Sequence, residues 1–95
     1  MHLITRKRLN DFAVTHPDTG TALLHWYRLM KRGQFRSFAN LRETFPTADL
    51  VDKLIVFNVG GNKARLIAAI HFNRQKVYIR AVLTHKEYDL GNWKK

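Results

Sequence analysis

The spacing of the apolar side chains changes once along this chain of 95 residues. Up to about residue 45 they recur every three or four positions, which is the spacing of one face of a helix. From Leu54 onward they alternate with other side chains, which is the pattern of strands. A chain of this length buries too little surface for two separate cores. We therefore expect a single α+β domain over residues 1–95, with N-terminal helices on one face of a small, mainly antiparallel sheet.

The first half of the chain is expected to contain three helices. Thr5 can cap the first and Ser37 the third, because hydroxyl oxygens accept hydrogen bonds from the free N–H groups of a first helical turn. Residues 1–4 are apolar enough for an edge strand, and residues 47–53 are expected to form a loop. The helices should cover residues 6–16, the stretch from Thr19 to Gly33 and the stretch from Ser37 to Pro46.

The second half is expected to be a meander of three strands whose last two strands are joined by a two-residue turn, Asn73-Arg74. Alternation counted from that turn sorts their side chains onto two faces. One face is apolar and should pack against the helices: Ala64, Leu66, Ala68, Ile70, Val77, Ile79, Ala81 and Leu83. The second face should be open to a ligand: Lys63, Arg65, Ile67, Ala69, His71, Lys76, Tyr78, Arg80, Val82 and Thr84. The strands should cover residues 54–59, 63–72 and 76–84, with Gly60-Gly61-Asn62 as the first turn and a loose tail over residues 93–95.

The chain is strongly basic. Seventeen Lys and Arg residues against seven Asp and Glu residues give a formal net charge of +10. Residues 1–52 hold eight basic and five acidic residues (+3), whereas residues 53–95 hold nine and two (+7). Such an excess on a small domain favours binding to a polyanion. Nucleic acid is the expected partner, and an acidic protein is the alternative.

The chain contains no cysteine, so disulfides and cysteine-based zinc sites are unavailable. The histidines are scattered and lack the spacing of a metal site, so we expect neither a metal nor a cofactor. The N-terminal residues lack the long apolar stretch of a signal peptide, and no apolar run is long enough to span a membrane. A cytoplasmic protein without membrane contact is therefore expected.

Two arginines of the second face, Arg65 and Arg80, are expected on neighbouring strands, with Ile67 opposite Arg80. On this diagonal the two guanidinium groups could hold one phosphate. The alternative is that both are solvated surface charges, the commoner fate of an isolated arginine. Further candidate RNA-binding residues on or next to this face are Lys63, His71, Lys76, Tyr78 and Lys86.

The segment Thr84-His85-Lys86-Glu87-Tyr88-Asp89 follows the last strand and is rich in titratable groups. RNA cleavage without a metal requires a base for the 2′-hydroxyl, cations for the phosphorane and an acid for the departing 5′-oxygen. His85 could serve as base or acid, since imidazole changes charge near neutral pH. Tyr88 could do so where Arg80 and Lys86 favour its phenolate, and stacking on a base is its simpler role. A histidine that starts a helix and a packing tyrosine are the structural alternatives.

Several segments resemble the HigB family of toxins, and together they span nearly the whole chain. The run from Thr84 to Asp89 after a basic strand is the most specific of them. The resemblance implies a RelE-like fold and an mRNA interferase activity that blocks translation, on the ribosome or on free mRNA. It also implies a HigA-like helix-turn-helix antitoxin, through which alone the toxin would contact operator DNA. The matching segments are Met1-His2-Leu3-Ile4-Thr5, Val56-Phe57-Asn58-Val59-Gly60-Gly61-Asn62, Arg65-Leu66-Ile67-Ala68 and Val82 to Asp89.

The resemblance also assigns site residues. RelE-like toxins carry an arginine on a strand, a later basic residue and a tyrosine near the C-terminus, which Arg65, Arg80 and Tyr88 match, and His85 matches the HigB motif. The chain departs from the wider group by lacking a lysine-rich segment ahead of its strands, which leaves the base and the acid unassigned. The expected function is a metal-independent endoribonuclease with Arg65, Arg80, His85 and Tyr88 as its catalytic set. The alternative is a non-catalytic basic RNA-binding module.

Overall fold

The structure is a computed structural model that describes residues 1–61 and 63–94. Within them five strands form one sheet in the order β1-β5-β4-β3-β2, and only the pair β1 and β5 is parallel. The expected α+β class with a mainly antiparallel sheet is therefore confirmed. The strands are β1 (His2–Ile4), β2 (Asp49–Val51), β3 (Leu54–Val59), β4 (Ala64–His71) and β5 (Lys76–Leu83).

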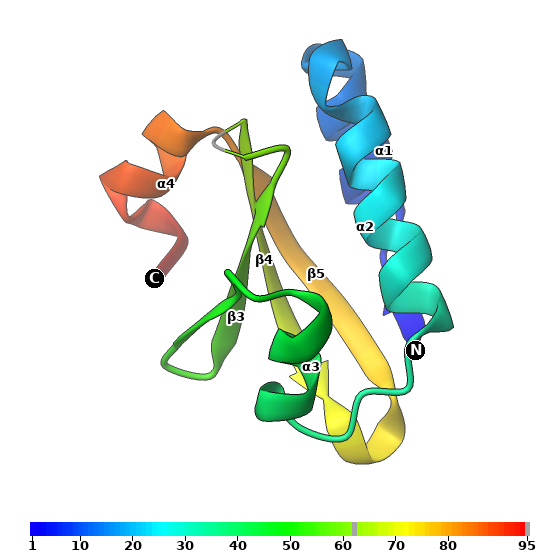
Figure 1. The fold of residues 1–95 in the computed structure, drawn as a ribbon. Coiled ribbons are helices and arrows are strands. Elements are labelled where there is room, and N and C mark those ends of the chain that lie inside the picture. Colours follow the sequence, from blue (N-terminus) through cyan, green and yellow to red (C-terminus); the bar gives the residue numbers. More distant parts are fainter. Residues whose placement is uncertain (62, 95) are drawn as a thin grey trace.

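Two long helices, α1 (Lys7–Thr15) and α2 (Gly20–Arg32), lie against one face of this sheet (Figure 1). The apolar stripe of each helix supplies the core, because residues three and four apart share a helix face. The short helix α3 (Phe38–Thr44) closes one end of this layer. Helices on one face of the sheet were expected and are found. The buried core includes Leu9, Phe12, Leu23, Trp26, Met30 and Leu41 from the helices, with Phe57, Leu66, Val77 and Ile79 from the sheet.

Two of the local expectations are wrong and one is confirmed. The hydroxyl of Ser37 accepts a hydrogen bond of 3.1 Å from the N–H of Asn40, so it caps α3 as expected. No side chain caps α1, whose cap position is Arg6 rather than Thr5. The expected loop over residues 47–53 contains β2, which pairs with β3 through a tight turn where Asp52 takes a φ of 55°. A strand of three residues is too short to show alternation, so only its pairing reveals it.

A bulge between β4 and β5 changes which side chains share a face. Ala68 pairs with Ile79, as the expected register requires, but the next pair joins Ile67 to Ala81, so Arg80 is the extra residue. Beyond Arg80 the faces exchange, and Val82 packs against the helical core in place of its neighbours. The expected faces are therefore right near the β4–β5 turn and wrong for residues 81–83.

Both turns of the meander differ in detail from the expected ones. The β4–β5 connection comprises residues 72–75 and ends with Gln75 at a φ of 54°, rather than being Asn73-Arg74 alone. The β3–β4 turn contains Gly60 and Gly61 at positive φ, as a tight hairpin requires. Asn62 of that turn lies outside the described residues.

The last helix, α4 (His85–Leu90), and the 3₁₀ turn η3 (Asn92–Lys94) lie on the other side of the sheet from α1 and α2 (Figure 1). Val56, Ile67 and Arg65 are buried although their strand positions place them away from the helical core. The sequence predicts that the second face is open along its whole length, and this prediction is wrong. The second face is covered at the end where β4 starts.

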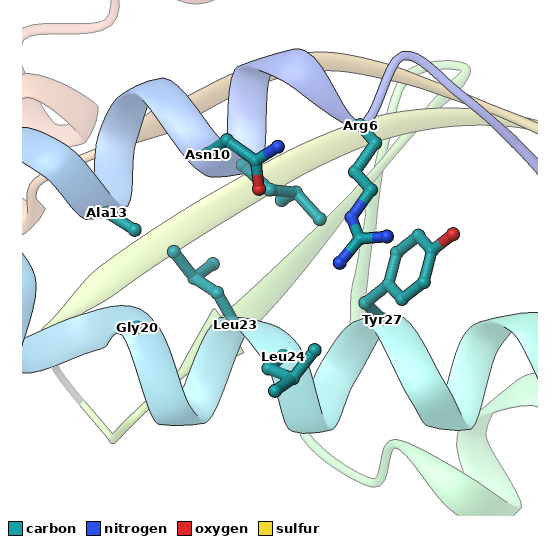
Figure 2. A pocket seen from close by; sticks show the side chains of 8 residues that line it. Arg6, Asn10, Ala13, Gly20, Leu23, Leu24 and Tyr27 are labelled. Atoms are coloured by element: carbon teal, nitrogen blue, oxygen red, sulfur yellow. The ribbon is translucent and has the colours of Figure 1, made fainter.

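The α1–α2 layer contains a small pocket of its own, shown in Figure 2. The guanidinium carbon of Arg6 lies 4.4 Å from the centroid of the Tyr27 ring across this pocket. The pocket belongs to the helical side of the molecule and is separate from α4. Across the described part of the chain, no helix has both the length and the apolar character needed to cross a membrane.

Candidate active site

Helix α4 is capped at both of its ends. The hydroxyl of Thr84 accepts a hydrogen bond of 3.1 Å from the N–H of Glu87, and the Glu87 carboxylate accepts one of 2.9 Å from the N–H of Thr84. This reciprocal capping box satisfies two N–H groups of the first turn. Gly91 ends the helix at a φ of 77°, a conformation that glycine adopts without strain. The two ends together define which side chains of the short helix reach the sheet.

Tyr88 lies against a cation and a second aromatic ring. The guanidinium carbon of Arg65 is 5.7 Å from the centroid of the Tyr88 ring, and Arg65 itself is only 9% exposed. Trp93 stacks on Tyr88 with ring centroids 5.0 Å apart and planes inclined by 14°. The indole N–H of Trp93 also donates a 3.0 Å hydrogen bond to the Tyr88 carbonyl. Trp93 is thus folded onto the site rather than part of a loose tail, whereas Lys95 lies outside the described residues.

His85 is oriented by a carboxylate one helical turn away. Its Nδ1 lies 3.0 Å from Oδ2 of Asp89, and both side chains are about half exposed. A carboxylate that accepts the Nδ1–H hydrogen bond fixes the ring and leaves Nε2 for proton transfer. No role for Asp89 follows from the sequence alone. The separation of four residues would have indicated the pair once Thr84 had been taken as the helix cap.

Arg80 does not sit where the sequence predicts. Arg65 pairs with Leu83, which is three residues beyond Arg80. In the expected register the partner of Arg65 would be only two residues beyond Arg80. Arg80 is exposed, and its side chain has neither a hydrogen bond nor an ion pair to any described residue. The expected placement of Ile67 opposite Arg80 is therefore wrong. The bulge leaves Arg80 as a solvated cation farther along the sheet from Arg65.

The remaining cations at this end are exposed. Lys63 lies at the end of the β3–β4 turn, next to the start of β4, and Lys86 is on α4. Neither forms an ion pair with a described residue. At the same end of the sheet lie two groups of contacting residues that share helix α4, in which Tyr88 contacts Arg65 and Trp93 and His85 contacts Asp89. We call them together the α4 cluster: Arg65, His85, Tyr88, Asp89 and Trp93.

The other three candidate residues, His71, Lys76 and Tyr78, lie at the opposite end of the same face and are called the turn-end group. His71 pairs with Lys76 across the strands, and its ring meets the edge of the Tyr78 ring at a centroid distance of 5.3 Å. His71 is six positions beyond Arg65 on β4, which corresponds to roughly 20 Å at the rise of a strand. The structure therefore divides the predicted set between two ends of the sheet.

A mixed sheet with N-terminal helices on one face is consistent with the fold of RelE-like toxins, and the comparison with known proteins gives the same class. The family model for HigB toxins, described as the RelE-like toxic component of a toxin-antitoxin system, matches residues 19–91. This chain belongs to the HigB toxin family, as its sequence segments indicate.

The curated relatives cover almost the whole chain. It is 46% identical over 92 residues to the "mRNA interferase toxin HigB" of Escherichia coli (strain K12), which spans 94% of this chain and 88% of that protein. The "mRNA interferase HigB" of Shigella flexneri shows the same identity and coverage. The "mRNA interferase HigB" of Escherichia coli O6:H1 is 33% identical over 92 residues, which is 94% of this chain and 89% of that protein.

Proposed function

We propose that this chain is an endoribonuclease that cleaves mRNA at the α4 cluster and thereby inhibits translation and growth. The single observation that supports this most is the α4 cluster itself. There a carboxylate-oriented imidazole and a phenol packed beside a nearly buried guanidinium share two turns of one helix. The names of the curated relatives as mRNA interferases support the same activity.

The proposed reaction is transfer of a phosphoryl group within the RNA. The 2′-oxygen attacks the adjacent phosphorus and loses its proton, while the bond from phosphorus to the 5′-oxygen breaks and that oxygen gains a proton. The products are a 2′,3′-cyclic phosphate and a 5′-hydroxyl end, so the step balances without an oxidant or a further reactant. The proposed proton transfers and positive charges come from side chains, without a metal. Arg65, beside Tyr88, supplies positive charge to the phosphorane, where such groups act most strongly. The exposed side chain of Arg80 adds charge to the same phosphate from its position farther along β5.

We assign the two proton transfers to Nε2 of His85 and to the hydroxyl of Tyr88. His85 is held by Asp89, and the Tyr88 ring is held by Trp93, so both groups have a fixed position before RNA binds. Fixed position is what general acid–base catalysis requires of its participants. Lys63 and Lys86 then contribute charge for holding the RNA strand.

The partners proposed for this activity are an antitoxin and translating mRNA. As a toxin-antitoxin component, the chain is expected to be neutralised by a HigA-like helix-turn-helix protein, which would carry any contact with operator DNA. Cleavage on the ribosome would place the protein in the cytoplasm, where mRNA is translated.

The assay uses purified protein with EDTA, on free mRNA and on translating ribosomes, and maps the new ends. Cleavage that leaves cyclic phosphate ends is expected in at least one arm. His85→Gln is then compared on a normal RNA and on one whose scissile 5′-oxygen is replaced by sulfur. A thiolate departs without protonation, so rescue by sulfur assigns His85 as the acid, and lack of rescue assigns it as the base.

A folded protein that binds RNA with steep salt dependence but cuts neither substrate would contradict the proposal. That outcome would support a non-catalytic RNA-binding module, which the charge of the turn-end group also suits.

A further inference from the structure

A second basic site lies at the end of the sheet opposite α4. The β4–β5 turn meets β1 and the loop after α2 there, near the N-terminus in Figure 1. Together they enclose an open recess, which we call the Gln75 recess. It is lined by Met1, His2, Gln34, Arg36, Arg74 and Gln75.

Gln75 ties the walls of this recess together. Its side-chain amide donates hydrogen bonds to the carbonyls of Phe35 and Phe72, at 2.6 Å and 2.7 Å. The backbone carbonyl of Gln75 accepts a 2.8 Å hydrogen bond from the N–H of His2. One residue therefore joins three segments that are far apart in the sequence. A site whose walls are fixed in advance loses less entropy when a ligand binds.

The same residue carries two locally unfavourable features. Its backbone is in the left-handed region, at a φ of 54°, a conformation that is unfavourable for residues other than glycine. Its amide oxygen Oε1 is buried and has no hydrogen-bond partner among the described residues. Strained residues and unpaired buried polar groups are concentrated at functional sites. A glycine here would remove the backbone strain but also both amide hydrogen bonds.

The recess carries unneutralised positive charge. Arg36 and Arg74 are exposed, and neither guanidinium forms a hydrogen bond or ion pair with any described residue. No Asp or Glu is among the lining residues. The planar guanidinium group matches the geometry of phosphate oxygens, which makes arginine the preferred residue for phosphate recognition. The chemistry of the recess therefore suits a phosphate rather than a cationic or neutral ligand.

We propose that the Gln75 recess binds a phosphodiester of RNA at a distance from the cleaved bond. This inference rests on the proposed function. His2 pairs with Lys76, so the recess continues directly into the turn-end group, which leads along the second face towards the α4 cluster. The recess and the α4 cluster lie at the two ends of a track of roughly 20 Å, a span set by the length of β4. The phosphodiester belongs either to the mRNA or to ribosomal RNA.

The test measures binding without cleavage, on RNA whose 2′-oxygens are methylated. The double variant Arg36→Ala/Arg74→Ala is compared with Arg8→Ala/Arg28→Ala, which removes the same charge from the helices. The first should bind a dodecanucleotide about tenfold more weakly, with a salt slope smaller by about 0.7 to 1.4, as expected for one or two lost phosphate contacts. A trinucleotide, which is too short to reach both ends, should show a smaller difference between the two variants than the dodecanucleotide does.

A second arm repeats the comparison with ribosomes. Loss of binding there, with the dodecanucleotide unaffected, would assign the phosphodiester to ribosomal RNA and still support the site. Equal salt slopes for both double variants in both arms would overturn the proposal. So would an Arg36→Ala/Arg74→Ala variant that binds RNA and ribosomes normally and loses only its binding to the purified antitoxin. Because no cleavage is measured, an inactive protein that binds RNA in this way would refute the proposed function alone.

Discussion

The two ends of the second face contain the same kinds of residues in different surroundings. The α4 end has His85, Tyr88 and Lys86, and the turn end has His71, Tyr78 and Lys76. At the α4 end the imidazole contacts a carboxylate and the phenol contacts a guanidinium and an indole ring. At the turn end the imidazole and the phenol contact each other edge to face.

This difference separates chemistry from binding. Proton transfer requires a side chain whose position and partner are fixed, whereas attraction of a polyanion requires only charge and aromatic surface. Composition therefore cannot distinguish the two ends, but their contacts can. Matched substitutions at the two ends test this interpretation directly.

The largest effect is expected from removal of the Tyr88 hydroxyl. Tyr88→Phe keeps the ring that stacks on Trp93 and removes only the proposed proton-transfer group. The kcat for mRNA cleavage should fall about 100- to 10,000-fold, the usual contribution of general acid–base catalysis. Single-turnover cleavage with saturating enzyme measures this loss, and thermal unfolding checks that the fold is retained.

Tyr78→Phe is the matched control at the turn end. It removes a hydroxyl from a ring that contacts His71, and its kcat should stay close to that of the parent protein. Equal losses in the two variants would abolish the distinction between the ends. Full activity of Tyr88→Phe with loss in Tyr88→Ala would instead assign Tyr88 a stacking role.

A smaller effect is expected when the ring beneath Tyr88 is removed. Trp93 touches Tyr88 by stacking and by a hydrogen bond to its carbonyl, so we treat it as a positioning residue. Trp93→Ala should lower kcat about tenfold at nearly constant KM, since an aromatic pair is worth roughly 0.5–1.5 kcal/mol and tenfold is 1.36 kcal/mol. Trp93→Phe keeps a ring and should recover most of the rate. A KM effect that Phe does not rescue would mean that Trp93 binds RNA directly.

Much of the fold could be predicted because its signals are local. The helix stripes, the Ser37 cap and the glycine turn after β3 depend on neighbours within a few residues. The strand β2 could not be predicted, because three residues show no period and their pairing with β3 is a tertiary contact. The bulge at Arg80 could not be predicted either, because the alternating pattern of the sequence continues without a break through residue 83.

The site was predictable as a set of residues but not as an arrangement. Charge and alternation placed Arg65, His71, Lys76 and Tyr78 on one face, as the register near the turn bears out. Burial of Arg65 and the stacking of Trp93 depend on α4 folding back over the sheet, which no local pattern indicates. The roles of His85 and Tyr88 stay predictions that rest on family resemblance and on their contacts.

The smallest expected effect concerns the carboxylate that distinguishes His85 from His71. Asp89→Asn keeps the side-chain shape and an oxygen that can accept the Nδ1–H hydrogen bond, but removes the negative charge. Both partners are about half exposed, and exposed ion pairs contribute roughly 0.2–1 kcal/mol, so kcat should fall only about two- to fivefold. Asp11→Asn, an exposed aspartate on α1, is the charge-matched control and should have no effect. Asp89→Ala should cost more than Asp89→Asn, because the imidazole then loses its orientation, and equal rates in the two variants would show that Asp89 acts through charge alone.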